Sequence, residues 1–337
     1  MPNRHLTRKF QACCLAGCLS LLISTSASAL NIVLSNDDGL TSNVKALYSE
    51  LKQRGHDVIV SVPCQGQSGM GAAILFLKPL TPLTESCLNN AASPGDPGAG
   101  PVTKSEENFD YQDFHYVNGT PVMATAYGLD ILALQRWGQA PDLVLSGPNE
   151  GRNAGVMINS SGTVSNAQFA AARGLPAIAL SAGMNSNGKF DENGNIADNP
   201  ISSAVAASMG EFIQALANSA NTASLLPAGI ALNINFPDEI KSDTPWRAAR
   251  IGTYNSSLIK FSADLSQDAA ARKFGVEGQP YPGMTLEHNS APPSAEQEND
   301  EAAVARSAVA VSVMQVSFGH NSPPQTWLQT LLDHIDH

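Results

Sequence analysis

The sequence contains Leu30-Asn31-Ile32-Val33-Leu34-Ser35-Asn36-Asp37-Asp38-Gly39, in which an apolar run leads directly into two adjacent carboxylates and a glycine. The apolar run is typical of a buried strand, and Gly39 allows a sharp turn after it. Two neighbouring carboxylates at the end of a buried strand are costly unless a positive charge lies beside them. A divalent cation such as Mg²⁺ would supply that charge, because hard cations prefer oxygen ligands. The alternative is a solvated turn, since these residue types also favour turns.

Strand-like and helix-like segments alternate along the rest of the chain. We expect strands at 31–34, 57–62, 142–146, 177–181 and 230–236, and helices at 43–54, 122–135, 163–173 and 201–220. This alternation predicts an α/β fold whose mostly parallel sheet carries helices on both faces. Ligands of such sheets bind beyond the carboxyl ends of the strands, so the polar loops that follow the strands should meet in one site.

The first 29 residues have the features of a signal peptide. A basic start (Arg4, Arg8, Lys9) precedes an apolar stretch and the small residues Ala27-Ser28-Ala29. We therefore expect cleavage near Ala29, export to the periplasm or the medium, and no stable membrane anchor, because the apolar stretch is too short to span a bilayer. Residues 30–337 should form one α/β domain: a core at about 30–250, a β extension at about 251–300, and a C-terminal strand and helix at about 301–337.

The net negative charge of the chain limits which molecules it can bind. The chain has 19 Lys and Arg against 30 Asp and Glu. An acidic protein does not attract nucleic-acid polymers, whereas a small phosphorylated substrate can still bind where a metal and backbone amides supply positive potential.

Cys64 and Cys87 are the two cysteines beyond the predicted signal peptide. In an oxidising compartment they can form a disulfide, and two separate thiols are equally compatible with the sequence.

Four polar loops follow predicted strands. They contain Asp37 and Asp38, Ser68 in a glycine-rich loop, Asn149 with Asn153, and Ser161-Gly162-Thr163 before a predicted helix. The start of a helix presents unpaired N–H groups that suit a phosphate, although Ser161 or Thr163 could instead be an ordinary N-cap. Together the loops predict an oxygen-only metal site beside a phosphate site, a combination suited to metal-assisted hydrolysis of a phosphate ester.

These segments resemble the survival protein SurE family of metal-dependent 5′/3′-nucleotidases. The resemblance covers about residues 30–240 and rests on Ile32-Val33-Leu34-Ser35-Asn36-Asp37-Asp38-Gly39, Gln67-Ser68-Gly69-Met70-Gly71, Val117-Asn118-Gly119-Thr120-Pro121, the segment 141–153, Ser161-Gly162-Thr163-Val164 and Leu232-Asn233-Ile234-Asn235-Phe236-Pro237. It implies a Rossmann-like core and a homo-oligomer, either a dimer or a tetramer, formed through the C-terminal β extension.

The resemblance also implies roles for individual residues. The ligands of a divalent cation, Mg²⁺ or Mn²⁺, would be Asp37, Asp38, Ser68 and Asn149. The phosphate would be contacted by Asn153, Ser161, Gly162 and Thr163. Asp37 and Asp38 would be the catalytic residues, and Asp37 would additionally help to activate the attacking water. The implied reaction is hydrolysis of nucleoside 5′- or 3′-monophosphates to nucleoside and phosphate.

Two other functions remain open at this point. The chain departs from the family pattern at Pro63-Cys64-Gln65 and at 308–315, which leaves room for an exported protein that binds nucleotide or phosphate without turnover. A broad-specificity acid phosphatase is the second alternative. A carboxylesterase using Ser68 or Ser161 is disfavoured, because neither serine lies in a Gly-x-Ser-x-Gly segment.

Overall fold

The computed structural model describes residue 1 and residues 29–188, 197–219, 224–273, 278, 280–316 and 332–333. The predicted signal peptide, apart from its two ends, lies outside these residues, and so does most of the predicted C-terminal helix. Among the helices of the described part, none combines the length and the apolar character needed to cross a bilayer.

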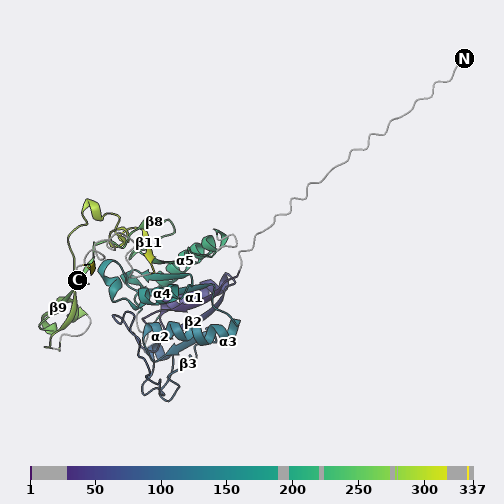
Figure 1. The fold of residues 1–337 in the computed structure, drawn as a ribbon, viewed down its shortest axis with the longest axis horizontal. Coiled ribbons are helices and arrows are strands. Elements are labelled where there is room, and N and C mark those ends of the chain that lie inside the picture. Colours follow the sequence, from purple (N-terminus) through teal and green to yellow (C-terminus); the bar gives the residue numbers. More distant parts are fainter. Residues whose placement is uncertain are drawn as a thin grey trace.

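A nine-stranded sheet forms the centre of the molecule (Figure 1). Its strands lie in the order β3-β4-β2-β1-β5-β6-β7-β11-β8. They are β1 (Asn31–Ser35), β2 (Asp57–Pro63), β3 (Ala99–Pro101), β4 (Phe114–Val117), β5 (Leu143–Glu150), β6 (Ala177–Ala182), β7 (Ile230–Asn235), β8 (Trp246–Ala249) and β11 (Val309–Gln315). The six strands from β4 to β7 pair in parallel, whereas β3 and β11 are antiparallel to β4 and β7. The predicted α/β fold with a mostly parallel sheet is confirmed.

The five strands expected from apolar runs are β1, β2, β5, β6 and β7. The sequence did not predict β3, β4 and β8, which have three or four residues each. Such short strands carry too little alternation to be recognised alone, and they form because a neighbouring strand supplies their hydrogen-bond partners.

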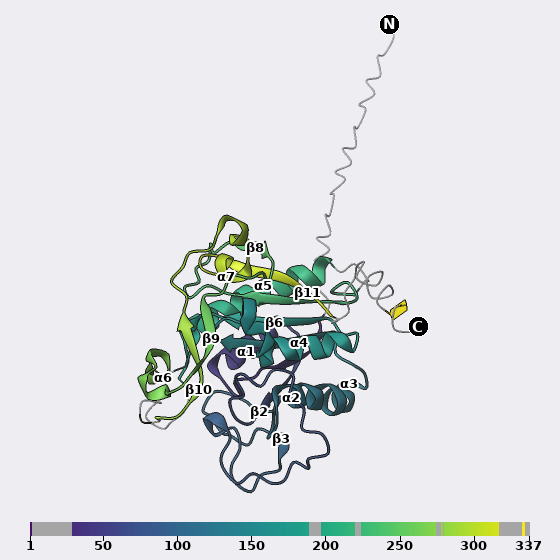
Figure 2. The ribbon, with the colours of Figure 1, turned by 60° about the vertical axis from the view of Figure 1, so that its left-hand side comes forward.

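Helices cover both faces of the sheet (Figure 2). On one face lie α1 (Ser42–Gln53) and α5 (Pro200–Ser219), and on the other α2 (Pro121–Tyr127), α3 (Ala133–Trp137) and α4 (Gly162–Ala172). The single helix expected at 122–135 is instead α2 and α3 joined by a wider π-helical turn, Gly128–Leu132. A short helix, α7 (Glu301–Val304), precedes β11.

The continuous apolar run of β1 follows from this two-sided cover. Ile32 and Leu34 belong to the core on the side of α1 and α5, whereas Val33 packs on the side of α4. All three side chains are fully buried, which is why the strand shows no polar alternation.

A separate two-stranded sheet projects from the main body. Its strands are β9 (Ser257–Ser262) and β10 (Gly283–His288), and a short helix, α6 (Ala269–Lys273), lies between them in the sequence. Figures 1 and 2 both show this hairpin extending away from the nine-stranded sheet. It lies within the segment where a β extension was expected.

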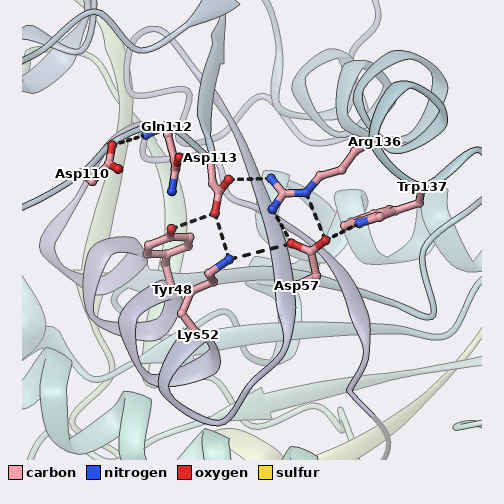
Figure 3. Close-up of polar contacts among 8 residues, drawn as sticks. All are labelled: Tyr48, Lys52, Asp57, Asp110, Gln112, Asp113, Arg136 and Trp137. Atoms are coloured by element: carbon pink, nitrogen blue, oxygen red, sulfur yellow. Dashed lines mark hydrogen bonds and ion pairs between the residues drawn. The ribbon is translucent and has the colours of Figure 1, made fainter.

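Two further features stabilise the sheet, one at the carboxyl ends of its strands and one at their amino ends. Cys64, directly after β2, is disulfide-bonded to Cys87, with Cα atoms 4.7 Å apart. At the other end, Asp57 at the start of β2 and Asp113 just before β4 share the guanidinium of Arg136 from α3 (Figure 3).

Candidate metal and phosphate site

The predicted loops meet where the strand order of the sheet reverses. From the central strand β1 the chain adds β2 and β4 on one side, and then β5, β6 and β7 on the other. The crevice beyond the carboxyl ends of β1 and β5 is therefore the topological switch point, the usual ligand position in such sheets.

The turn after β1 is closed by Asn36. Its side chain donates from Nδ2 to the carbonyl of Gly39 (2.7 Å) and accepts from the Gly39 N–H (3.1 Å). The backbone carbonyl of Asn36 in turn accepts from Asn166 of α4. This closed turn fixes the two carboxylates that lie inside it.

Asp37 faces the first turn of α4. The Thr163 hydroxyl donates to Asp37 Oδ1 (2.5 Å), and the Gly162 N–H donates to Oδ2 (3.2 Å). A Cβ at Gly162 would lie 2.6 Å from Asp37 Cβ, so only glycine permits this approach. The positive end of α4 is thereby directed at the Asp37 carboxylate.

Asp38 lies between the other two loops. Its Oδ1 is 3.4 Å from the Ser68 hydroxyl, and its Oδ2 accepts from the Glu150 N–H at 2.9 Å. The side chain of Asn149, at the end of β5, completes the group: its Oδ1 is 3.2 Å from the Thr163 hydroxyl. The structure thus brings together the four predicted metal ligands, Asp37, Asp38, Ser68 and Asn149.

The electrostatics of this group fit a divalent cation. Burial raises the pKa of Asp37, and burial together with the charge of Asp37 raises the pKa of Asp38 to about 8. Within the described residues neither carboxylate forms a salt bridge with a lysine or arginine. Two carboxylates, one hydroxyl and one carboxamide oxygen form the oxygen-only donor set that hard cations prefer.

The described part of the chain offers no competing cluster of three or more His, Cys, Asp or Glu side chains for a metal. The donor set at the switch point contains only two such residues, and its other members are serine and asparagine. It is therefore unlike the cysteine and histidine sites typical of zinc.

The four residues predicted to bind phosphate do not form one group, unlike the four predicted metal ligands. The Ser161 side chain accepts from the Val164 N–H and caps α4, so the N-cap alternative holds for Ser161. Gly162 and Thr163 direct donors at Asp37 and thus lie at the metal end of the site. Asn153 makes no hydrogen bond to the other predicted site residues in the described part of the chain; its Nδ2 donates to Ser181 at the end of β6.

Sequence reasoning missed two contributions from Glu150. Its backbone N–H binds Asp38, and its carboxylate adds negative charge that further raises the pKa of Asp38. The Glu150 side chain itself accepts from the Gly188 N–H. A backbone donor carries no residue-type signal, so no pattern in the sequence could have identified the first contribution.

This fold and site define a doubly wound α/β protein with a cluster of oxygen donors at its switch point. The family model described as "Survival protein SurE" matches residues 32–257, well over half of the chain. The chain belongs to the SurE family.

Known relatives agree with this assignment. An acid phosphatase of Yarrowia lipolytica is 34% identical over 216 residues, which cover 62% of this chain and 57% of that protein. A 5′-nucleotidase SurE of Desulfatibacillum aliphaticivorans is 31% identical over 209 residues, covering 62% and 66%. One from Thermosipho africanus is 30% identical over 225 residues, covering 66% and 71%. The chain thus spans less than two thirds of the first two relatives.

A solved structure shows the same fold. The crystal structure of the SurE protein from Aquifex aeolicus superimposes with a TM-score of 0.61 at 22% sequence identity, and the match covers 91% of this chain and all of that one.

Proposed function

We propose that this protein is a metal-dependent phosphomonoesterase that hydrolyses nucleoside 5′- or 3′-monophosphates to nucleoside and phosphate. The observation that carries the proposal is the group formed by Asp37, Asp38, Ser68 and Asn149 at the start of α4, where no lysine or arginine of the described part of the chain pairs with the two carboxylates. Membership of the SurE family supports the reaction class, and so do the names of the relatives, acid phosphatase and 5′-nucleotidase SurE.

Mg²⁺ or Mn²⁺ would be held by the four predicted ligands. When bound, such an ion offsets the charge of phosphate oxygens and lowers the pKa of a coordinated water. The contribution of the protein is to fix the oxygens before substrate arrives. Thr163 does this directly, because its hydroxyl lies between Asp37 and Asn149.

The phosphate would lie between the metal ligands and the loop 151–159. The start of α4 supplies a positive dipole end on one side, and the buried carboxamide of Asn153 supplies, on the other, the N–H that it does not donate to Ser181. Asp37, held by Thr163 and Gly162, is oriented to accept a proton from the attacking water.

Phosphate release from AMP, 3′-AMP and p-nitrophenyl phosphate tests this function. We expect release with Mg²⁺ or Mn²⁺, none with EDTA, and release lowered by about a hundredfold or more in Asp37→Asn. Turnover that survives both EDTA and this substitution would reject the metal mechanism. Binding of AMP without phosphate release would instead identify a non-catalytic nucleotide-binding protein.

The same panel addresses a second candidate, a phosphatase of broad specificity. It is favoured by the acid phosphatase of Yarrowia lipolytica, to which the chain is 34% identical. Comparable kcat/KM values for p-nitrophenyl phosphate and AMP would indicate broad specificity, whereas a large preference for AMP would indicate a nucleotidase.

We further propose that the protein is exported and cleaved near Ala29. The Cys64–Cys87 disulfide supports this, because disulfides persist in oxidising compartments. Intact-mass measurement of the protein recovered from the periplasm or the medium tests it, with a mature chain beginning at Leu30 as the expected result. A chain that retains the first 29 residues would contradict it.

A homo-oligomer, dimer or tetramer, is also proposed. Large apolar side chains are exposed on the β9–β10 hairpin, among them Phe261 and Met284 at 68% and 61%. Light scattering during size-exclusion chromatography should give a multiple of the chain mass. Phe261→Ser should shift the protein towards a monomer, and a monomeric parent protein would contradict the proposal.

A further inference from the structure

The backbone of Asn153 is held by a buried polar network. Its carbonyl accepts from Asn233 Nδ2 (2.9 Å) and from Asn235 Nδ2 (3.0 Å), both on β7. Its side chain donates to Ser181 of the neighbouring strand. All four side chains are buried, so water does not compete with these hydrogen bonds.

Glu301, from the other end of the chain, completes this network. Its Oε2 accepts the other hydrogen bond of Asn233 Nδ2 (2.9 Å), and its Oε1 accepts from the Gly155 N–H (3.0 Å). Each carboxylate oxygen of Glu301 therefore accepts a hydrogen bond, one from β7 and one from the segment that carries Asn153. Glu301 lies at the start of α7, 148 positions after Asn153 in the sequence.

This carboxylate is costly to bury. Glu301 is fully buried, burial raises its pKa, and within the described residues it forms no salt bridge. An apolar side chain of similar size would fill the space at a lower desolvation cost. Glu301 nevertheless has an effect that an apolar residue lacks, because it fixes the direction of the Gly155 N–H and of the Asn233 amide.

Asn255 holds the same segment from the base of the β9–β10 hairpin. Its Oδ1 accepts from the Val156 N–H at 2.6 Å. Gly155 has a φ of +58°, and a Cβ there would lie 2.1 Å from Asn255 Oδ1, so the close contact requires glycine. Residues 153–156 are therefore bound by two side chains from the C-terminal part of the chain.

We propose that Glu301 is a positioning residue for the phosphate end of the site, where it fixes the segment 153–156 and thereby Asn153, assisted by Asn255. The inference rests on the proposed function, because the proposed function is what assigns Asn153 to the phosphate. Through Glu301 the proposal extends the site beyond residues 32–257 that match the family model, whereas Asn255 lies within them. Glu301 does not touch substrate in this proposal; it acts through Asn153.

The test is Glu301→Gln, which keeps the size of the side chain but turns one acceptor into a donor that faces Gly155 or Asn233. We expect KM for AMP and the inhibition constant of inorganic phosphate to rise about tenfold or more, since small displacements of a binding group have effects of this order. We expect kcat and the Mn²⁺ activation constant to change by less than about threefold, because the metal ligands are not in the network.

Two further variants separate positioning from a general effect on the fold. In an Asn153→Ala background, Glu301→Gln should have little additional effect on KM, because residues that act through one another are not additive. Asp113→Asn, a buried carboxylate variant at the opposite end of the sheet, should lower stability without changing KM. Asn255→Ala, a milder change, should raise KM in the same direction and covers the case in which Glu301→Gln does not fold.

Hydrogen–deuterium exchange over residues 151–159 measures the contact independently of turnover. Exchange in this segment should be faster in Glu301→Gln and unchanged in Asp113→Asn. An active parent enzyme whose KM and exchange are unaffected by Glu301→Gln, or whose Glu301→Gln and Asn153→Ala effects are additive, would overturn the positioning role alone. An inactive parent enzyme would overturn the proposed function, and the exchange result would then still decide whether Glu301 holds the segment.

Discussion

Each end of the central sheet holds a pair of carboxylates, and the two pairs differ in what lies beside them. At the amino ends of the strands, Asp57 and Asp113 share the guanidinium of Arg136, and Asp113 also binds Lys52 (3.1 Å) and Tyr48 (2.8 Å) (Figure 3). At the carboxyl ends, the donors that reach the two adjacent acids of the candidate site from the described residues are all neutral, and they come from Thr163, Gly162, Ser68 and Glu150.

The difference separates a structural cluster from the candidate functional one. Burial alone would raise the pKa of Asp113, but hydrogen bonds from Arg136, Tyr48 and Lys52 lower it below its ordinary value. Burial raises the pKa values of the carboxylates of the candidate site, the charge of Asp37 raises that of Asp38 further, and among the described residues no side-chain cation offsets these effects. A cluster that is neutralised internally stabilises the fold, whereas one that is not can bind a cation from solution.

The largest expected effect comes from Asp37→Asn. This nearly isosteric change removes a charge from the metal site, and phosphate release from AMP should fall by about a hundredfold or more. Asp57→Asn is the matched control at the other end of the sheet and should retain activity. Equal losses in the two variants would remove the distinction between the two ends.

Removing the Cys64–Cys87 disulfide tests how the carboxyl ends of the strands, where the candidate site lies, are stabilised. Replacing Cys64 and Cys87 together by alanine should lower the free energy of unfolding by about 3 kcal/mol, because the bond closes a long loop in the unfolded chain. Urea unfolding with and without a reductant measures this. The parent protein in reductant should match the double variant, and an unchanged midpoint in both would contradict a stabilising role for the bond.

A substitution in the ion-pair cluster of Asp57, Asp113 and Arg136 should lower stability and leave activity unchanged, the reverse of a substitution in the candidate site. Arg136→Ala removes the cation shared by Asp57 and Asp113 and should cost about 2 kcal/mol of unfolding free energy. Activity at a temperature where the variant is folded should be retained. A stable variant with lost turnover would show that this cluster contributes to function after all.

The smallest effect is the acid dependence of the same cluster. The folded-state pKa of Asp113 lies below its ordinary value of 3.8, so its contribution to stability is present above about pH 4 and is lost as the pH falls through the folded pKa. The difference in unfolding free energy between the parent protein and Asp113→Asn should therefore be larger at pH 7 than at pH 3. A difference that does not vary with pH would contradict the charge-based stabilisation.

The long buried strands and the position of the site could be predicted from the sequence. The apolar runs of β1, β2 and β5 identify strands covered on both faces, and the topology of parallel sheets then places their following loops together. The proximity of Ser68 and Asn149 to the adjacent pair Asp37 and Asp38 follows from these two rules, although the three segments are far apart in the sequence.

The remaining features depend on packing that leaves no local pattern. The Thr163 hydroxyl points at Asp37 and Asn149 because α4 packs against β1 and β5, which the sequence of the loop does not reveal. Glu301 lies beside Gly155 in a structure where β11, the strand that follows α7, pairs with β7, and no local pattern around Glu301 reveals this contact. The pairing of Cys64 with Cys87 likewise required the geometry of the loop that follows β2.

Calorimetric titration of the purified protein with Mn²⁺ tests most directly whether the two ends of the sheet differ as described. We expect one ion per chain, binding at least about tenfold weaker in Asp38→Asn, and unchanged binding in Asp57→Asn. Equal Mn²⁺ affinity in the parent protein and Asp38→Asn, or no binding to either, would contradict a metal site at Asp37 and Asp38.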